Sequence, residues 1–181
     1  GAIPFGLLLT KAAGGGDIRN IGSGNIGATN VLRTGRKGLA ALTLLLDLLK
    51  GFFAVFIAAD YLPGGAVFAA AGAFFGHLYP VWLGFKGGKG VATYAGIMFG
   101  LFWQGGVVYA IAWIGALVIF RISSLAGLLA ALCAPIAAAY FGRYDLVALL
   151  VACTLIVFVK HRTNIENLMD GTEPRIGKSK S

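Results

Sequence analysis

The sequence contains few charged residues. Lysine, arginine, aspartate and glutamate make up 12% of its 181 residues, whereas 58% are hydrophobic. A soluble domain of this length usually carries about a quarter charged residues. The shortage of charge therefore excludes an ordinary soluble domain and predicts a polytopic membrane protein.

Cysteine is also scarce, and several catalytic signatures are missing. Cys133 and Cys153 both lie inside apolar runs, away from any metal-ligand spacing, so we expect two small buried side chains. The sequence lacks a Ser–His–Asp set, a metal-ligand cluster and a Walker signature. What remains is an inventory of phosphate binders, hydroxyls and amides, which suits catalysis by positioning and electrostatic stabilisation.

The apolar residues fall into six segments, at about 39–59, 65–85, 91–102, 105–120, 123–140 and 146–159. A straight span needs about 20 residues, so the short segments must borrow flanking residues. An apolar stretch over 1–10, ended by Lys11, is half a span, and no basic residue precedes it as in a signal peptide. The predicted fold is all-α, with seven transmembrane helices of which the first is incomplete.

The basic residues alternate between the connections. Of the 15 lysines and arginines, 13 lie on alternate connections or in the tail from Lys160, the exceptions being Lys50 and Arg143. Basic residues favour the cytoplasmic side, so we predict a multi-pass plasma or inner membrane protein with its amino end outside and its tail inside. The polar stretches 20–34, 85–93, 121–124 and 161–173 then share the cytoplasmic face. The membrane topology thus accounts for the net charge of +8, and nucleic-acid binding is not needed to explain it.

The stretch "GSGNIGATN", residues 22–30, joins two of these segments. Glycines let successive backbone N–H groups point inward, and such concave arrays bind anions. Ser23, Thr29 and the asparagines add neutral donors, and Arg33 follows within one turn if a helix begins near Thr29. A flexible linker is the alternative, but the asparagines and the arginine favour an anion site.

The stretch "FKGGKGVAT", residues 85–93, places Lys86 and Lys89 around two glycines, and Gly90 opens an apolar run. Backbone N–H groups at a helix start with a lysine beside them form a phosphate site. The P-loop spacing is absent, which disfavours nucleotide hydrolysis. The alternative is a tight turn whose lysines only satisfy the topology rule.

The tail stretch "KHRTNIENLMDGTEP" is expected to continue the last span. His161 and Asn164 are three apart and would share a helical face, whereas Glu166 would point elsewhere. A catalytic His–acid pair is therefore disfavoured. A polar surface histidine is the plain alternative.

Three polar residues lie within the spans. Asp47 and Lys50 are three apart, so we expect a pair with a structural role. His77 would lie roughly 10 Å of helix from the stretch 85–93, which we call the lysine loop. It could line a cavity or bond a neighbouring backbone group.

Together, "GSGNIGATN" at 22–30, "GHLYPVWLGFKGGKGVAT" at 76–93 and "HRTNIENLMDGTEP" at 161–174 resemble the bacterial acyl-phosphate:glycerol-3-phosphate acyltransferases of the PlsY type. "DLLKG" at 47–51 also matches, and the resemblance covers essentially the whole chain. Ala2 stands where the family often has serine. The resemblance implies acyl transfer from a fatty acyl phosphate to glycerol 3-phosphate, giving lysophosphatidate and inorganic phosphate.

The resemblance also assigns roles by matching position. It implies that Lys89 and the neighbouring glycines hold the acyl phosphate, and that Arg33 and Ser23 hold a substrate phosphate. It also implies that His161 and Asn164 orient glycerol 3-phosphate or the stretch 22–30, which we call the first loop. The implied catalytic residues are Ser23, Lys89, His161 and Asn164. The implied substrate-binding residues are Asn25, Gly27, Thr29, Asn30, Arg33, Lys86, Gly87, Gly88, Gly90, Thr93, Ser124 and Glu166.

Residues 1–181 are expected to form one integral membrane acyltransferase domain, with 161–181 a polar cytoplasmic tail. The resemblance implies no metal or other cofactor, with the acyl phosphate as co-substrate, membrane lipid as surroundings, and functional coupling to the enzyme that makes acyl phosphate. An anion or phosphate-ester transporter is the alternative from another class. Neither glycine loop has a second copy, which disfavours transport.

Overall fold

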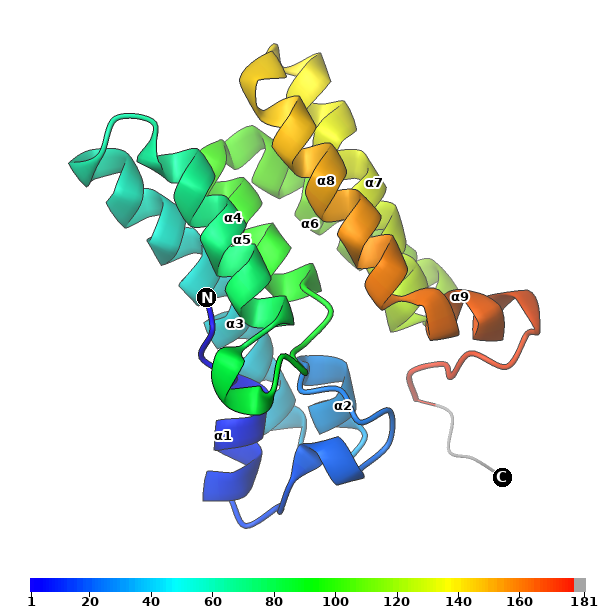
Figure 1. The fold of residues 1–181 in the computed structure, drawn as a ribbon. Helices are drawn as coiled ribbons and strands as arrows, with labels where there is room; N and C mark the ends of the chain where they lie inside the picture. The colour runs from blue at the N-terminus through cyan, green and yellow to red at the C-terminus, as the bar shows by residue number, and fades with distance from the viewer. Residues whose placement is uncertain (178–181) are drawn as a thin grey trace. The chain divides into compact units, whose positions relative to one another are not determined.

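The computed structural model describes residues 1–177, in which the regular elements are all helices. The chain divides into two compact units, Gly1–Leu101 and Phe102–Ser181 (Figure 1). Lys178 and Lys180, at the end of the predicted tail, lie outside the described residues. The first unit contains α1 (Phe5–Ala12), η1 (Ile18–Asn20), α2 (Ala28–Leu32), α3 (Lys37–Tyr61), α4 (Gly65–Leu78), η2 (Val81–Leu83) and α5 (Val91–Leu101).

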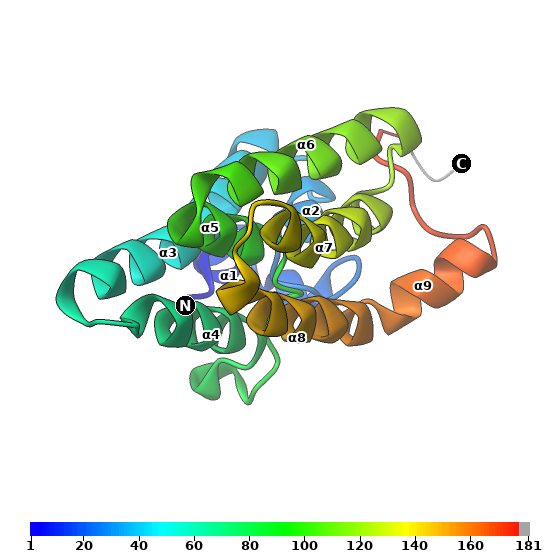
Figure 2. The same ribbon diagram turned by 90° about the horizontal axis from the view of Figure 1, so that it is seen from above.

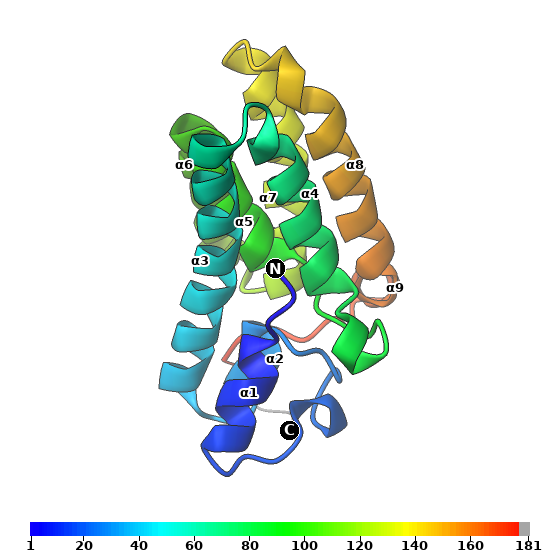
Figure 3. The ribbon, with the colours of Figure 1, turned by 60° about the vertical axis from the view of Figure 1, so that its left-hand side comes forward.

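Three helices form the body of the first unit. Helix α3 packs against both α4 and α5, and α4 also contacts α5 (Figure 3). Helix α4 ends just before Pro80, which has no N–H group to continue the helical hydrogen bonds. The predicted segment 65–85 is therefore a helix followed by a single 3-10 turn.

Glycines bring α3 and α5 into close contact. A Cβ atom at Gly96 would lie 1.9 Å from the carbonyl oxygen of Leu48, and one at Gly51 would lie 2.4 Å from that of Thr93. Small residues that let two backbones approach are the usual basis of helix packing in membranes, where burial from water supplies no driving force. The fit of α3 on α5 thus depends on the missing side chains.

The second unit contains α6 (Trp103–Phe120), α7 (Ser123–Tyr140), α8 (Tyr144–Lys160) and α9 (Arg162–Met169). Helix α7 packs between α6 and α8, as Figure 2 shows, and buries a row of alanines. The hydroxyl of Thr154 on α8 donates to the carbonyl of Ala131 at 2.8 Å. Cys153 is buried, as predicted, and Cys133 is partly buried.

Four helices in the described residues have the length and composition to cross a membrane: Lys37–Tyr61, Gly65–Leu83, Trp103–Phe120 and Ser123–Tyr140. A fifth span follows if Tyr144–Lys160 and Arg162–Met169, which meet at a bend of 62°, are counted together. Helix α5 is apolar but has only 11 residues. The membrane-spanning, all-helical fold is confirmed, whereas the count of seven spans remains a prediction.

The tail stretch, which the sequence predicts to continue the last span, follows α8 as a separate helix, α9, at a bend of 62°. The chain bends at His161, whose backbone lies outside both helices, so His161 and Asn164 are not on one continuous helical face. The bend lets the polar helix α9 leave the direction of the apolar helix α8.

We predict that Gly96→Leu lowers the free energy of unfolding by about 3 kcal/mol or more, because the new side chain must displace the backbone of α3. Thermal unfolding of the purified protein in detergent measures the effect. Gly72→Leu on α4 is the matched control, since nothing lies within 4 Å of a Cβ at that position. Equal stability of the two variants would contradict this account of α3 and α5.

Candidate active site

The first glycine-rich stretch is held by the side chain of Asn30. Its amide nitrogen lies 3.0, 2.9 and 2.8 Å from the carbonyl oxygens of Ile18, Ile21 and Asn25, so its two hydrogens are shared among three acceptors. Its amide oxygen accepts from the backbone N–H of Ser23 at 3.0 Å. One buried side chain thus satisfies four backbone groups of residues 18–25, so this stretch has a defined conformation and is not a flexible linker.

Residues 22–24 of the loop are exposed around this centre. Gly22 and Gly24 have φ values of 58° and 68°, a region that side chains rarely adopt. A Cβ on Gly22 would lie 2.4 Å from the Asn30 amide oxygen and 3.1 Å from Cδ of Arg33, so the arginine side chain lies close to the Gly22 backbone. Ser23 and Arg33 are both exposed. The loop presents a hydroxyl and a guanidinium group on a fixed backbone.

The start of α2 follows the prediction closely. The side-chain oxygen of Asn25 accepts from the N–H of Gly27 at 2.8 Å, and α2 begins at Ala28, one residue from the expected start at Thr29. Arg33 caps the other end of this short helix. The amides of Asn25 and Asn30 are thus engaged within the loop, and their direct contact with a substrate remains a prediction.

The second glycine-rich stretch folds back onto the end of α4. The N–H groups of Gly87 and Gly88 donate to the carbonyls of Leu78 and His77 at 3.1 and 3.0 Å. A Cβ on Gly87 would lie 2.1 Å from the His77 carbonyl oxygen, and one on Gly88 would lie 2.1 Å from the His77 ring nitrogen Nε2. Only glycine fits at both positions. The stretch is therefore more than a turn whose lysines satisfy the topology rule, because its glycines let the loop pack against α4.

The lysine loop ends at the start of α5, as predicted. Gly90 has a φ of 90° and its carbonyl accepts from the N–H of Tyr94 at 2.7 Å, while α5 begins at Val91. Lys86 is exposed and Lys89 is partly buried beside this helix start. Thr93 is fully buried in the first turn, and its hydroxyl has no hydrogen-bond partner within the described residues. Its predicted role in substrate binding remains a prediction.

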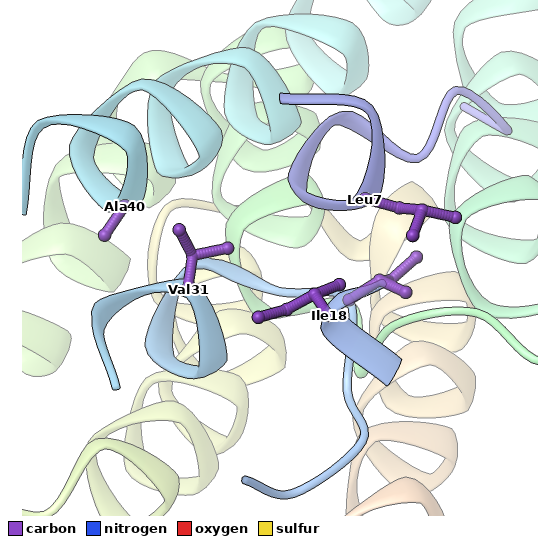
Figure 4. Packing of buried hydrophobic residues seen from close by; sticks show 5 residues of the cluster. Leu7, Ile18, Val31 and Ala40 are labelled. Atoms are coloured by element: carbon purple, nitrogen blue, oxygen red, sulfur yellow. The ribbon is translucent and has the colours of Figure 1, made fainter. Parts of the chain in front are cut away.

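A hydrophobic cluster brings the two stretches together in the first unit. Leu7, Ile18, Ile26, Val31 and Ala40 form its buried centre, contributed by α1, η1, the first loop, α2 and α3 (Figure 4). Leu83, which lies just before the lysine loop, packs against the same cluster. The first loop and the base of the lysine loop therefore rest on one apolar support.

Electrostatics around these loops favour an anion. Residues 1–101 include eight basic and three acidic residues, and two of the acids are paired internally. Asp17 accepts from Arg19 at 2.6 Å, and this guanidinium, by hydrogen bonding and charge, holds the pKa of the carboxyl group well below its usual range. Arg33 and Lys86 remain exposed on the loops.

In the second unit a buried carboxylate, Glu173, collects the polar side chains. Ser124 and Asn164 donate to one of its oxygens at 2.6 Å each, and Asn167 donates to the other at 3.1 Å. The N–H of Ile176 donates to the carbonyl of Arg121 at 2.7 Å, which holds the returning chain. The sequence reasoning missed Glu173 and selected Glu166, which is exposed.

His161 is 3% exposed at the bend between α8 and α9. Its Nδ1 lies 2.8 Å from the carbonyl oxygen of Val157. Because a carbonyl only accepts, Nδ1 carries a hydrogen, and this contact fixes the ring orientation. The predicted residues Ser124, His161, Asn164 and Glu166 thus lie in the second unit, and the others lie in the first.

The family model for "Glycerol-3-phosphate acyltransferase" matches residues 1–171. The chain belongs to this acyltransferase family. Glycerol-3-phosphate acyltransferases from Mesorhizobium japonicum (strain LMG 29417 / CECT 9101 / MAFF 303099) and Erythrobacter litoralis (strain HTCC2594) are each 60% identical over 177 residues. The alignments cover 98% of this chain and 91% and 90% of those proteins.

Two solved structures of a family member are similar to the chain. They are crystal structures of PlsY (YgiH), an integral membrane glycerol 3-phosphate acyltransferase, in a glycerol 3-phosphate form and a lysophosphatidic acid form. The TM-scores are 0.92 and 0.89, with 36% and 34% identity; both cover 97% of this chain, and 90% and 89% of the other. The chain is accordingly a membrane acyltransferase with transmembrane helices, as its sequence predicts.

We predict that Asn30→Asp opens the first loop, because a carboxylate cannot donate to the three carbonyls that the amide now satisfies. Hydrogen–deuterium exchange of the segment 18–30 should quicken by about tenfold or more, the equivalent of one lost hydrogen bond. Asn20→Asp, at an exposed position of the same stretch, is the control. Unchanged exchange in the Asn30 variant would show that the loop does not depend on this amide.

We predict that Glu173→Ala lowers the free energy of unfolding by about 3 kcal/mol, because three buried or half-buried donors lose a charged acceptor. Glu166→Ala should change it by less than about 0.5 kcal/mol, since that side chain is exposed. Denaturant-induced unfolding in detergent compares the two. The reverse order would contradict the structural role of Glu173.

Proposed function

We propose that the chain transfers a fatty acyl group from an acyl phosphate to glycerol 3-phosphate, giving lysophosphatidate (1-acyl-glycerol 3-phosphate) and inorganic phosphate. This reaction would be the first acylation in bacterial phospholipid synthesis. The observation that carries the proposal is the pair of glycine-rich stretches with exposed cations, both resting on one hydrophobic cluster. Two phosphate-bearing substrates would need two such anion sites.

The names of similar proteins support the acceptor. The relatives are glycerol-3-phosphate acyltransferases, and the PlsY structures are described as glycerol 3-phosphate and lysophosphatidic acid forms. The acyl phosphate donor is our proposal, which the resemblance to the PlsY-type acyltransferases implies. A donor that carries phosphate suits the lysine loop and the start of α5, where helix dipole and ammonium charge both favour an anion.

The proposed transfer needs little acid–base help from the protein. A glycerol hydroxyl oxygen attacks the carbonyl carbon of the acyl phosphate, and the bond from this carbon to the phosphate oxygen breaks. The bonding electron pair leaves with the phosphate, and the hydroxyl proton passes to a phosphate oxygen of the substrate. Catalysis then rests on the fixed placement of both substrates and on neutralising the charge that grows on the leaving group.

Each group of residues has a proposed part in this reaction. Lys89, with the N–H groups around Gly90 at the start of α5, neutralises the acyl phosphate. Ser23 and Arg33 hold a substrate phosphate at the first loop. His161 and Asn164 orient glycerol 3-phosphate or the first loop. The hydrogen bond of Asn164 to Glu173 then holds this amide ready in the second unit.

The remaining proposals concern the surroundings of the reaction. We propose seven spans in one domain in the inner membrane. The amino end would lie outside, and the functional loops and the tail would lie in the cytoplasm. There the enzyme that makes acyl phosphate would supply its product. We propose no metal or other cofactor. No group of three His, Cys, Asp or Glu side chains that could hold a metal ion lies within residues 1–177.

The test is phosphate release from palmitoyl phosphate by purified protein in lipid, with and without glycerol 3-phosphate. We expect release that depends on glycerol 3-phosphate and falls by about tenfold or more in Lys89→Ala and Arg33→Ala, because each variant removes a cation from an anion site. Arg143→Ala removes an arginine that pairs with Asp145 outside both loops, and serves as the control. Folded wild-type protein without acceptor-dependent release would refute the proposal and direct attention to transport.

A further inference from the structure

A buried polar network lies directly behind the lysine loop. Lys50 on α3 donates to the carboxylate of Asp47 at 2.5 Å, and its Nζ lies 2.8 Å from Nδ1 of His77 on α4. Asp47 and His77 are 3% and 4% exposed. The predicted Asp47–Lys50 pair is confirmed. His77 contacts the lysine loop directly and does not lie roughly 10 Å from it. It joins the ion pair to the loop.

The hydrogen bonds of Lys50 define which nitrogen of His77 carries hydrogen. An ammonium group has three hydrogens and no acceptor. Lys50 has three acceptors, namely the Asp47 carboxylate, the Ile3 carbonyl at 2.8 Å and Nδ1 of His77. Nδ1 of His77 is therefore an acceptor, and the neutral ring carries its hydrogen on Nε2.

The other side of the His77 ring touches the lysine loop. A Cβ atom on Gly88 would lie 2.1 Å from Nε2 of His77, so the ring packs against the Gly88 backbone. The carbonyl of His77 accepts from the N–H of Gly88 at 3.0 Å, and the next carbonyl, that of Leu78, accepts from Gly87. Both the side chain and the backbone of His77 thus contact the two glycines next to Lys89.

A purely structural role does not account well for this arrangement. Burying a charged pair costs about as much as the pair returns, and apolar side chains of similar size would hold α3 and α4 together equally well. What the polar network adds is direction, because hydrogen bonds fix the ring of His77 where van der Waals packing alone would permit other rotamers. The ring that is fixed in this way is the surface on which the lysine loop rests.

We propose that Asp47, Lys50 and His77 form a relay of fixed contacts that sets the position of the lysine loop, and that His77 is a positioning residue for the acyl phosphate. The assignment of acyl phosphate as the substrate rests on the proposed function. The contact between the network and the lysine loop is seen in the structure and is independent of that function. Substituting His77 should therefore disturb the loop in the protein without substrate, and should weaken the use of the donor more than that of the acceptor.

The first test is a double-mutant cycle between His77 and Gly88. His77→Asn places its Oδ1 where Nδ1 now accepts from Lys50, but it removes the ring atoms that face Gly88. Gly88→Ala should clash with the ring in the wild-type background and fit in the space that the asparagine leaves. We expect Gly88→Ala to raise the KM for palmitoyl phosphate by about tenfold or more in the wild-type background and by about threefold or less beside His77→Asn.

The KM for glycerol 3-phosphate separates positioning from general damage. In His77→Asn we expect the KM for palmitoyl phosphate to rise by about tenfold while that for glycerol 3-phosphate changes by less than about twofold. Phe68→Ala, at an exposed position of the same helix, controls for effects on α4. Additive effects of His77→Asn and Gly88→Ala, or equal effects on both substrates, would overturn the proposed positioning role.

A second measurement requires no activity. Hydrogen–deuterium exchange of the segment 84–90 should quicken by about tenfold in His77→Asn, while exchange of the segment 18–30 stays unchanged. Unchanged exchange at 84–90 in a folded variant would overturn the contact between network and loop. If wild-type protein shows no acyl transfer but the exchange result holds, the proposed function fails and the inferred support of the loop stands.

Discussion

The four hydrogen bonds of the Asn30 side chain are the constraint on which the first loop depends. A loop that offers N–H groups to an anion must leave some backbone groups outside regular structure, and its carbonyls then need partners. The Asn30 amide supplies donors to three of these carbonyls. Because the amide carries no charge, it meets this need without adding an anion beneath a surface meant to bind one.

The same principle applies to the lysine loop, with α4 as the partner. Gly87 and Gly88 direct their N–H groups to the carbonyls of Leu78 and His77 in the last turn of α4, just before Pro80. The lysine loop is therefore held by hydrogen bonds to the end of α4. Phe85, with a φ of 63°, shows that the loop holds even a bulky residue in the left-handed region.

The parts that could be predicted from the sequence depend on contacts between near neighbours. Apolar runs give the main helices, Asp47 and Lys50 pair over one helical turn, and Gly90 precedes α5. Glu173 could not be recognised, because Ser124 lies 49 residues away and the chain must turn back after α9 before the carboxylate reaches Asn164. Glu166 comes from the resemblance by matching position, and its part in substrate binding remains a prediction. The link from Lys50 to His77 spans 27 residues and follows only from the packing of α3 on α4.

The acids of the molecule show how charge is divided between support and binding. Asp17 and Asp47 pair with Arg19 and Lys50, and Glu173 receives neutral donors in the second unit. A carboxylate exposed at either glycine loop would repel a phosphate, whereas a carboxylate committed to an internal partner contributes little field at the surface. These three acids thus have internal partners, while Arg33 and Lys86 remain exposed. This division explains how a chain with so few charges can present positive loops and still hold them in place.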